Sequence, residues 1–146
     1  MLDKLGQPGR NDTAIETACR DLVNGYSRCV DNFEDEALVQ MFAREGRWLQ
    51  PRVAPFEGRE QIRAFLASRD RAVTMRHAIT NVLVDVRDAT HASGVSYFTV
   101  YRQPRDTPAA QALTPFAVGE YHDEFVLEEG RWRFASRDIR FAFRGA

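Results

Sequence analysis

Histidine is the side chain best suited to moving a proton near neutral pH, and the chain contains three of them. His77 and Asn81 share one face of an extended segment, residues 74–87, where both faces are partly apolar and alternation does not decide which points inward. His91 lies in an expected turn, and His122 alternates with two glutamates on a face expected to point outward. We therefore expect His77 in any catalytic site. Without a second inward histidine at ligand spacing, we expect no metal site.

A later extended segment, residues 115–128, carries two more polar candidates. Tyr121 and Asp123 are the polar side chains on an otherwise mostly apolar face. Because side chains alternate along a strand, we expect this face to point inward, with both residues on the wall of a pocket. The expected substrate contacts are completed by three further side chains: Asn81, Tyr97 and Trp48.

The elements that must position these residues divide the chain into two parts. Residues 1–11 are expected to form a flexible arm, and residues 12–146 a single domain. Apolar residues at three- and four-residue spacing predict three helices, at about 13–32, 35–43 and 59–72. A short strand is expected at 47–50, and period-two patterning then predicts four long strands, at about 74–87, 92–103, 115–128 and 131–143.

Helices followed by a strand meander predict an α+β fold, with helices on one face of a strongly curved antiparallel sheet. Such a sheet forms a cone, and the three N-terminal helices would enclose a pocket inside it. Gly130 is expected to supply the positive φ of a tight hairpin turn. The connection over residues 104–115 is long for a hairpin, which indicates either a lid or a disordered loop.

Composition excludes several classes of function. A net charge of −1 with no basic stripe argues against a nucleic-acid partner. No secretory signal or apolar run of membrane-spanning length is present, so we expect no membrane association and a cytoplasmic location. Cys19 and Cys29 would lie about 15 Å apart on one helix, too far to pair. No phosphate loop or dinucleotide fingerprint is found, and we expect no cofactor.

Six short patterns, in order, carry a resemblance to a known family: Tyr26 and Asp31 at the end of the first helix, Leu38-x-x-x-Phe42-Ala43, Gly58-Arg59-x-x-Ile62-x-x-Phe65-Leu66, Arg76-His77-x-x-x-Asn81, Gly119-x-Tyr121-x-Asp123, and Gly130-Arg131-Trp132-Arg133-Phe134. Over about residues 13–143 the chain resembles a SnoaL-like domain of the nuclear transport factor 2-like superfamily. That resemblance implies the cone-shaped, cystatin-like fold, usually as a homodimer or homotrimer packed through the sheet. The superfamily includes isomerases, dehydratases, polyketide cyclases, dioxygenase β subunits and non-enzymatic binders, so the fold alone does not assign a function.

The resemblance to the dehydratases of this superfamily implies three catalytic residues: Tyr26, Asp31 and His77. An imidazole can take or give a proton near pH 7, and a carboxylate on its other nitrogen fixes the tautomer and stabilises the charged form. A tyrosine hydroxyl in the cone could stabilise an enolate. The match departs at one point, because the dehydratases carry a further acid or base on the second long strand. That strand here offers Ser96, Tyr97, Thr99 and Tyr101, none of which is of a type that titrates near pH 7.

Helix geometry leaves a second interpretation open. Five residues correspond to about 140° of rotation, so Tyr26 and Asp31 cannot point at one spot unless the helix ends at Asp31 or crosses the pocket obliquely. In the alternative, Asp31 caps the second helix or binds an arginine, Tyr26 is a core aromatic, and His77 is a hydrogen-bonded sheet histidine.

The expected function is therefore a small cofactor-independent enzyme that performs acid/base proton transfer on a hydrophobic cyclic ligand. The substrate would be a steroid-like, terpenoid or polyketide compound, and the reaction a dehydration, isomerisation or cyclisation. His77 would be the general base, Asp31 its orienting partner, and Tyr26 and Tyr121 hydrogen-bond donors. Two alternatives remain: a non-catalytic β subunit of a ring-hydroxylating dioxygenase, and a ligand-binding module without turnover.

Overall fold

The computed structural model describes residues 12–108 and 112–145, so the arm expected at 1–11 lies outside the described residues. Its elements follow in this order: α1 (Thr13–Asn32), α2 (Asp35–Gln40), β1 (Phe42–Leu49), β2 (Phe56–Glu57), α3 (Gly58–Ala67), β3 (Val73–Val86), β4 (His91–Pro104), β5 (Ala117–Glu128) and β6 (Arg131–Arg144). The expected α+β class is confirmed, with three helices before four long strands. Helices α2 and α3 end earlier than their apolar spacing predicts.

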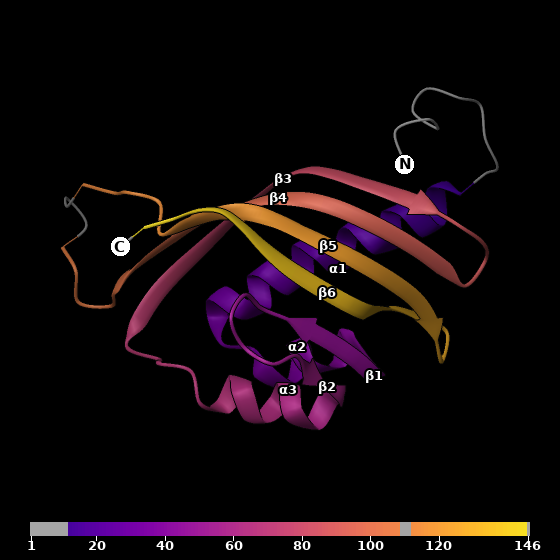
Figure 1. Ribbon diagram of the computed structural model, residues 1–146, viewed down its shortest axis with the longest axis horizontal. Helices are drawn as coiled ribbons and strands as arrows, with labels where there is room; N and C mark the ends of the chain where they lie inside the picture. The colour runs from indigo at the N-terminus through magenta and orange to yellow at the C-terminus, as the bar shows by residue number, and fades with distance from the viewer. Residues whose placement is uncertain (1–11, 109–111, 146) are drawn as a thin grey trace.

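The sheet is curved and unclosed, and it has six strands in the order β2-β1-β6-β5-β4-β3 (Figure 1). Strands β3 to β6 form the expected antiparallel meander. The sheet extends beyond this meander, because β1 joins β6 in a parallel pairing and β2 joins β1. This pairing is non-local, so hydrophobic patterning along the chain does not reveal it. Helix α1 packs mainly against β3, and α3 against β1.

Helix α1 is positioned by one apolar face and by a sharp stop. Cys19, Val23, Tyr26 and Val30 lie at three- and four-residue spacing and are all buried. The helix ends where Phe33 adopts a left-handed conformation, with φ of 58°. No helix within the described residues is long and apolar enough to cross a membrane.

Bulges break the simple alternation of the long strands. In the β5–β6 pairing, Phe125 lies opposite Phe134 but Glu124 lies opposite Ser136, so Ala135 is an extra residue. Phe134 and Arg137 consequently both point into the core, and both are fully buried. Alternation alone would have placed these two side chains on opposite faces.

A second bulge explains Asn81. The β3–β4 register shifts between Thr80 and Leu83, and Asn81 adopts a φ of 53° there. Its side chain is exposed and does not line the apolar cavity described below, so Asn81 lies apart from the expected substrate contacts that do line it. Asparagine is among the few residue types that tolerate this conformation. The residue therefore has a backbone role.

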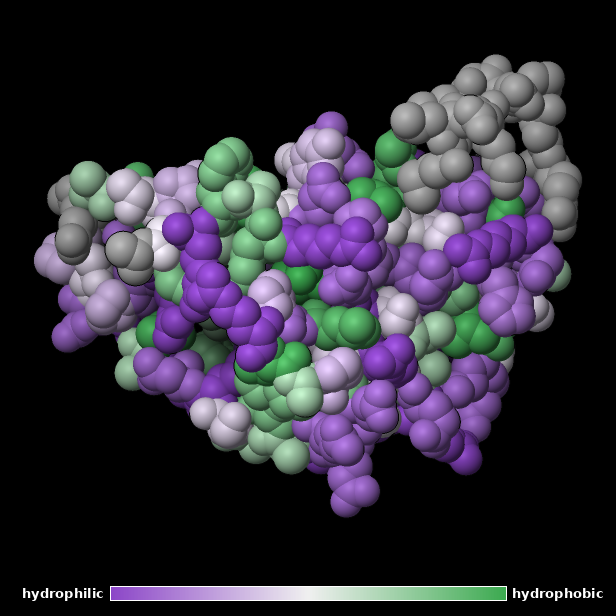
Figure 2. Space-filling view, in the orientation of Figure 1, coloured by the Kyte–Doolittle hydropathy of each residue, from purple (hydrophilic) through white to green (hydrophobic). Residues whose placement is uncertain are grey.

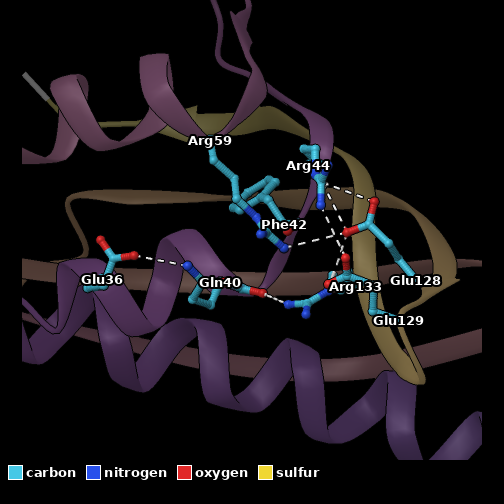
Figure 3. Close-up of polar contacts among 8 residues, drawn as sticks. All are labelled: Glu36, Gln40, Phe42, Arg44, Arg59, Glu128, Glu129 and Arg133. Atoms are coloured by element: carbon cyan, nitrogen blue, oxygen red, sulfur yellow. Dashed lines mark hydrogen bonds and ion pairs between the residues drawn. The ribbon is translucent and has the colours of Figure 1, made fainter.

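A polar cluster joins the β5–β6 hairpin to the helical layer (Figure 3). The Glu128 carboxylate accepts the backbone N–H of Arg44 at 3.1 and 3.2 Å and lies 3.5 Å from the guanidinium groups of Arg59 and Arg133. Arg133 in turn donates to the carbonyl of Gln40, at the C-terminus of α2. One carboxylate thus connects β1, α3 and β6 at this end of the sheet.

The bulge at Asn81 gives a stability test. Replacing Asn81→Gly should change the free energy of unfolding by less than about 0.5 kcal/mol, because glycine adopts positive φ freely. Asn81→Val should lower it by about 1–2 kcal/mol, because a β-branched side chain is strained there. Urea denaturation measures both, with Thr80→Val, one residue earlier on the same strand, as the control. A valine variant as stable as the wild type would contradict the left-handed backbone.

Candidate functional site

Asp31 and His77 form a double hydrogen bond between α1 and β3. One carboxylate oxygen of Asp31 accepts the backbone N–H of His77 at 2.9 Å, and the other lies 2.6 Å from His77 Nδ1. The two side chains are 8% and 10% exposed. Because β3 is an edge strand, the His77 N–H has no further strand to bind. The helix therefore supplies the acceptor that a neighbouring strand would have supplied.

This contact fixes the chemistry of the imidazole. A carboxylate is only an acceptor, so Nδ1 carries the proton of the neutral ring and Nε2 keeps its lone pair. If Nε2 then takes a proton, the Asp31 carboxylate stabilises the imidazolium that results. The arrangement is that of an oriented general base.

His77 lines an apolar cavity of about 290 Å³. Three other residues singled out in the sequence also line it: Tyr26, Tyr121 and Trp48. Most of the remaining wall is hydrophobic, with Met75 from β3, Phe98 and Val100 from β4, and Ile139 from β6. Its volume lies near the lower end of the roughly 300–1,000 Å³ typical of ligand pockets. The cavity suits a compact ring compound.

Asp31 faces a different hollow on the other side of His77. This second hollow measures about 330 Å³, and its lining is mostly polar or charged: Asn24, Ser27, Arg28, Asp31, Asn32, Arg76, His77 and Ile79. His77 is the residue shared by the two linings. The dyad therefore separates an apolar chamber from a polar one. If His77 took a proton from a ligand in the apolar cavity, only the imidazole and the Asp31 carboxylate would separate that proton from the polar hollow.

A buried ion pair, Arg137 with Asp123, lies behind the two cavity tyrosines. Arg137 donates from Nε and Nη2 to the two oxygens of Asp123, at 2.8 and 2.6 Å, and both side chains are essentially inaccessible. The guanidinium carbon lies 4.1 Å from the ring centres of Tyr26 and Tyr121 and 4.2 Å from that of Phe134. Arg137 thus holds both cavity tyrosines in place through their ring faces.

The two tyrosines are neutral donors. Burial raises the pKa of both Tyr26 and Tyr121 above the ordinary tyrosine value, and this outweighs the opposite effect of the nearby Arg137. Both hydroxyls therefore keep their protons throughout the physiological range. A tyrosine in this state can donate to an oxygen that becomes negatively charged.

Two further candidates, Asp123 and Tyr97, lie outside the apolar cavity. Asp123 does not line the apolar cavity, because Arg137 occupies both of its oxygens. Tyr97 is 47% exposed on the opposite face of β4 from Phe98, which is buried. Trp48 lines the cavity, and its indole Nε1 is buried with no hydrogen-bond partner among the described residues.

Several residues at the site gave little sequence signal. Val100 and Arg102 follow the inward alternation of β4, but the pattern does not show that they face a cavity. Arg137 was missed because the extra residue at Ala135 reverses the alternation before it. In a single sequence, nothing near Ala135 indicates that bulge.

The other histidines also pair with carboxylates but lie elsewhere. His91 Nδ1 is 3.3 Å from Asp88 at an exposed turn, and His122 Nε2 is 2.7 Å from Glu120 on the outer side of the sheet. Neither lines the apolar cavity. Within residues 12–108 and 112–145, no three histidine, cysteine or acidic side chains come together to hold a metal ion.

The two cysteines lie in surroundings that disfavour the thiolate form. Both are free and buried. Burial raises the pKa of the Cys19 thiol to about 12. Burial, reinforced by the Glu34 carboxylate, also raises the pKa of Cys29. Both shifts favour the protonated thiol over the thiolate that nucleophilic chemistry needs.

The sequence profile of the SnoaL-like domain matches residues 11–138. The chain belongs to the SnoaL-like family. No curated protein sequence matches it. This chain has the same architecture as solved structures from Novosphingobium aromaticivorans, which confirms the nuclear transport factor 2-like, cystatin-like fold.

Three of these structures illustrate the similarity. A candidate scytalone dehydratase is 19% identical, with 99% of this chain and 91% of that chain covered and a TM-score of 0.78. A nuclear transport factor 2-like protein is 18% identical, with coverages of 97% and 95% and a TM-score of 0.74. A candidate aromatic ring hydroxylase is 21% identical, with coverages of 88% and 89% and a TM-score of 0.73. At these identities the similarity shows the fold alone.

The buried ion pair gives a second stability test. Asp123→Asn should lower the free energy of unfolding by about 3–5 kcal/mol, because it leaves Arg137 charged and uncompensated in an apolar setting. Glu124→Gln is the matched control. It removes the next carboxylate, which pairs with Arg87 at 2.9 Å but is 46% exposed, and should cost less than about 1 kcal/mol.

Urea denaturation followed by tryptophan fluorescence compares these variants. If Asp123→Asn does not fold, the double variant Asp123→Leu/Arg137→Met takes its place and should recover most of the loss, since an apolar pair needs no charge compensation. Equal stability of Asp123→Asn and Glu124→Gln would contradict the burial of the pair.

Proposed function

We propose that this protein is a cofactor-independent enzyme that transfers a proton at a carbon next to a carbonyl group of a small hydrophobic cyclic compound. The observation that carries this proposal is His77, whose Nδ1 lies 2.6 Å from Asp31 while its ring lines an apolar cavity. A plain ligand-binding pocket needs no oriented base. The substrate would be a steroid-like, terpenoid or polyketide ring compound that fits the cavity.

The reaction would begin at Nε2 of His77. This nitrogen takes a proton from the carbon next to the carbonyl, and the C–H electron pair moves to the carbonyl oxygen to give an enolate. The hydroxyl of Tyr26 or Tyr121 donates to that oxygen, while Asp31 stabilises the imidazolium. Burial keeps both tyrosines protonated for this role, since it raises their pKa values.

The fate of the enolate distinguishes the possible reactions. If a hydroxyl group lies on the next carbon, it leaves with the proton carried by His77, and the products are an enone and water. If the proton returns to a different carbon, the result is an isomerisation. If the enolate attacks a second carbonyl, a ring closes. The relative that is a candidate scytalone dehydratase supports the first outcome.

One structural feature narrows the mechanism. The inward positions of β4 beyond Ser96 are Phe98, Val100 and Arg102, and none of them is an acid or base suited to neutral pH. Because β4 supplies no acid or base, and Asp70 in the lining is paired with Arg102, we assign the return of the proton to His77 itself. Departure and arrival of the proton would occur on the same face of the substrate.

A second candidate function is a non-catalytic β subunit of a ring-hydroxylating dioxygenase. The similarity to a candidate aromatic ring hydroxylase favours it. Such a subunit would need neither the base nor an accessible cavity. Stable co-purification with an iron–sulfur α subunit, together with no turnover by the isolated protein, would support this alternative.

Proton transfer can be tested before the natural substrate is known. In D₂O, bicyclic and tricyclic ketones and β-hydroxy ketones report base catalysis as deuterium uptake next to the carbonyl, measured by NMR, or as the ultraviolet absorbance of an enone. Wild-type protein should accelerate one or both. His77→Gln should reduce kcat by about 10²–10⁴-fold, and Asp31→Asn by at least about tenfold, because the base is removed or misoriented.

The chain supplies its own controls. His91→Gln and His122→Gln each remove a histidine from a carboxylate pair outside the cavity, and they should retain wild-type rates. A loss of less than about tenfold in His77→Gln would disprove its role as general base. Absence of exchange with every ketone in the panel would favour the binding-module or β-subunit alternatives.

A further inference from the structure

The mouth of the apolar cavity has a different chemistry from its interior. We use the word mouth for the part of the wall formed where β3 and β5 begin and β4 and β6 end, beside the segment after α3. Charged side chains line this part of the wall, among them Arg69, Asp70 and Arg102. In Figure 2, pale green apolar side chains lie next to purple charged ones around the C-terminal end of β6. A ligand that fills the cavity would therefore meet charge at its outer end.

Arg102 is the least restrained of the lining arginines. Its nearest carboxylate is Asp70, at 3.9 Å, and that group also accepts the backbone N–H of Ala72 at 2.8 Å. Arg69 differs, because it is bound to Asp35 at 2.8 Å and to the carbonyl of Val30 at 3.3 Å. The donors of Arg102 thus remain available to a ligand.

A second arginine, Arg144, contacts the same aromatic ring as Arg102. The guanidinium carbons of Arg102 and Arg144 are 5.5 and 5.6 Å from the ring centre of Phe116, and that of Arg144 is 5.4 Å from Phe141. Both rings line the cavity. A guanidinium stacked on an aromatic face keeps its N–H edge free for a carboxylate. The stacking therefore places Arg102 in the cavity wall and Arg144 against two of its rings, without using the N–H donors of either.

The local charge is positive in a protein whose net charge is −1. Among the described residues, the ion pairs here join Arg102 to Asp70, and both Arg69 and Arg71 to Asp35. With Arg144, which contacts the Phe116 ring, this group has four arginines and two aspartates and a formal charge of +2. The mouth thus favours an anion, whereas the cavity behind it favours rings.

We propose that the ligand is an amphiphilic acid, whose ring system fills the apolar cavity while its carboxylate binds Arg102, with Arg144 beside it. The proposal rests on the cavity of the proposed function and specifies its substrate class. On the sheet, His77 lies opposite Val100 and Met75 opposite Arg102, so His77 and Arg102 are diagonal neighbours with Cα atoms roughly 7–8 Å apart. The reacting carbon at His77 and the carboxylate at Arg102 would be separated by about one ring.

Two matched probes test this proposal by binding alone. 2-Naphthylacetic acid and 2-naphthylacetamide have the same shape and differ in charge, and isothermal titration calorimetry at low ionic strength gives both dissociation constants. Wild-type protein should bind the acid about tenfold more tightly than the amide, because a charge-assisted hydrogen bond is stronger than a neutral one. In 0.5 M NaCl the preference should shrink.

Arg102→Gln should reduce the preference to about threefold or less, while amide binding stays unchanged. Arg144→Gln should reduce it by a smaller factor. The control is Arg140→Gln, which removes the same charge from an exposed pair with Asp138 and should leave the preference intact. Equal binding of acid and amide by the wild type, no binding of either, or an unchanged preference in Arg102→Gln would each overturn the proposal.

This result can be separated from the fate of the proposed enzyme activity. His77→Gln should keep the full preference for the acid, because the base does not touch the carboxylate. A preference for the acid without turnover would support the role of Arg102 and contradict the catalytic role of His77. Turnover without a preference for the acid would support the catalytic role and contradict the role of Arg102.

Discussion

The double hydrogen bond between Asp31 and His77 is the contact on which the site depends. It satisfies the backbone of an edge strand, attaches the end of α1 to the sheet, and fixes the tautomer of the imidazole. A second contact, from Arg20 to the carbonyl of Val82 at 2.7 Å, attaches the same helix further along β3. Eleven helical residues and five strand residues each span about 16 Å, and eleven residues make about three helical turns. Helix α1 can therefore bind the open edge of β3 at both points with one face.

The same geometry resolves the angle between Tyr26 and Asp31. The two side chains do not converge on one point. Tyr26 points into the core and lines the apolar cavity, whereas Asp31, in the last turn before the left-handed Phe33, reaches the edge of β3 and faces the polar hollow. His77 lies between them and lines both chambers. Tyr26 and Asp31 therefore point in different directions from α1, and His77 lies between them. The two interpretations left open by the sequence are partly compatible, because Tyr26 is a core aromatic and also part of the cavity wall.

A polar core beneath an apolar cavity is costly unless every charge has a partner. Arg137 and Asp123 meet this condition by pairing through both oxygens, and three aromatic rings cover the guanidinium. Tyr26 and Tyr121 remain neutral donors beside this pair. Both oxygens of Asp123 are bound to Arg137, so Asp123 is not available to a ligand. The proposed contact for a ligand carboxylate is Arg102 at the mouth, so the proposed site combines an apolar cavity, one oriented base and a positively charged edge.

The sequence by itself determined the class of fold, the limits of the long strands and the histidine of interest, because these follow from local periodicity and from the side-chain types present. It also gave Tyr26, Asp31 and His77 as a set through family resemblance, but it could not show that Asp31 and His77 touch. Only the tertiary structure decided which residues share a face where strands bulge. The extra residue at Ala135 makes Arg137 point inward. The bulge at Asn81 gives that residue a left-handed backbone conformation and leaves its side chain outside the cavity. The parallel β1–β6 pairing and the grouping of Arg102 with Arg144 join residues distant along the chain, and local patterning carries no record of such contacts.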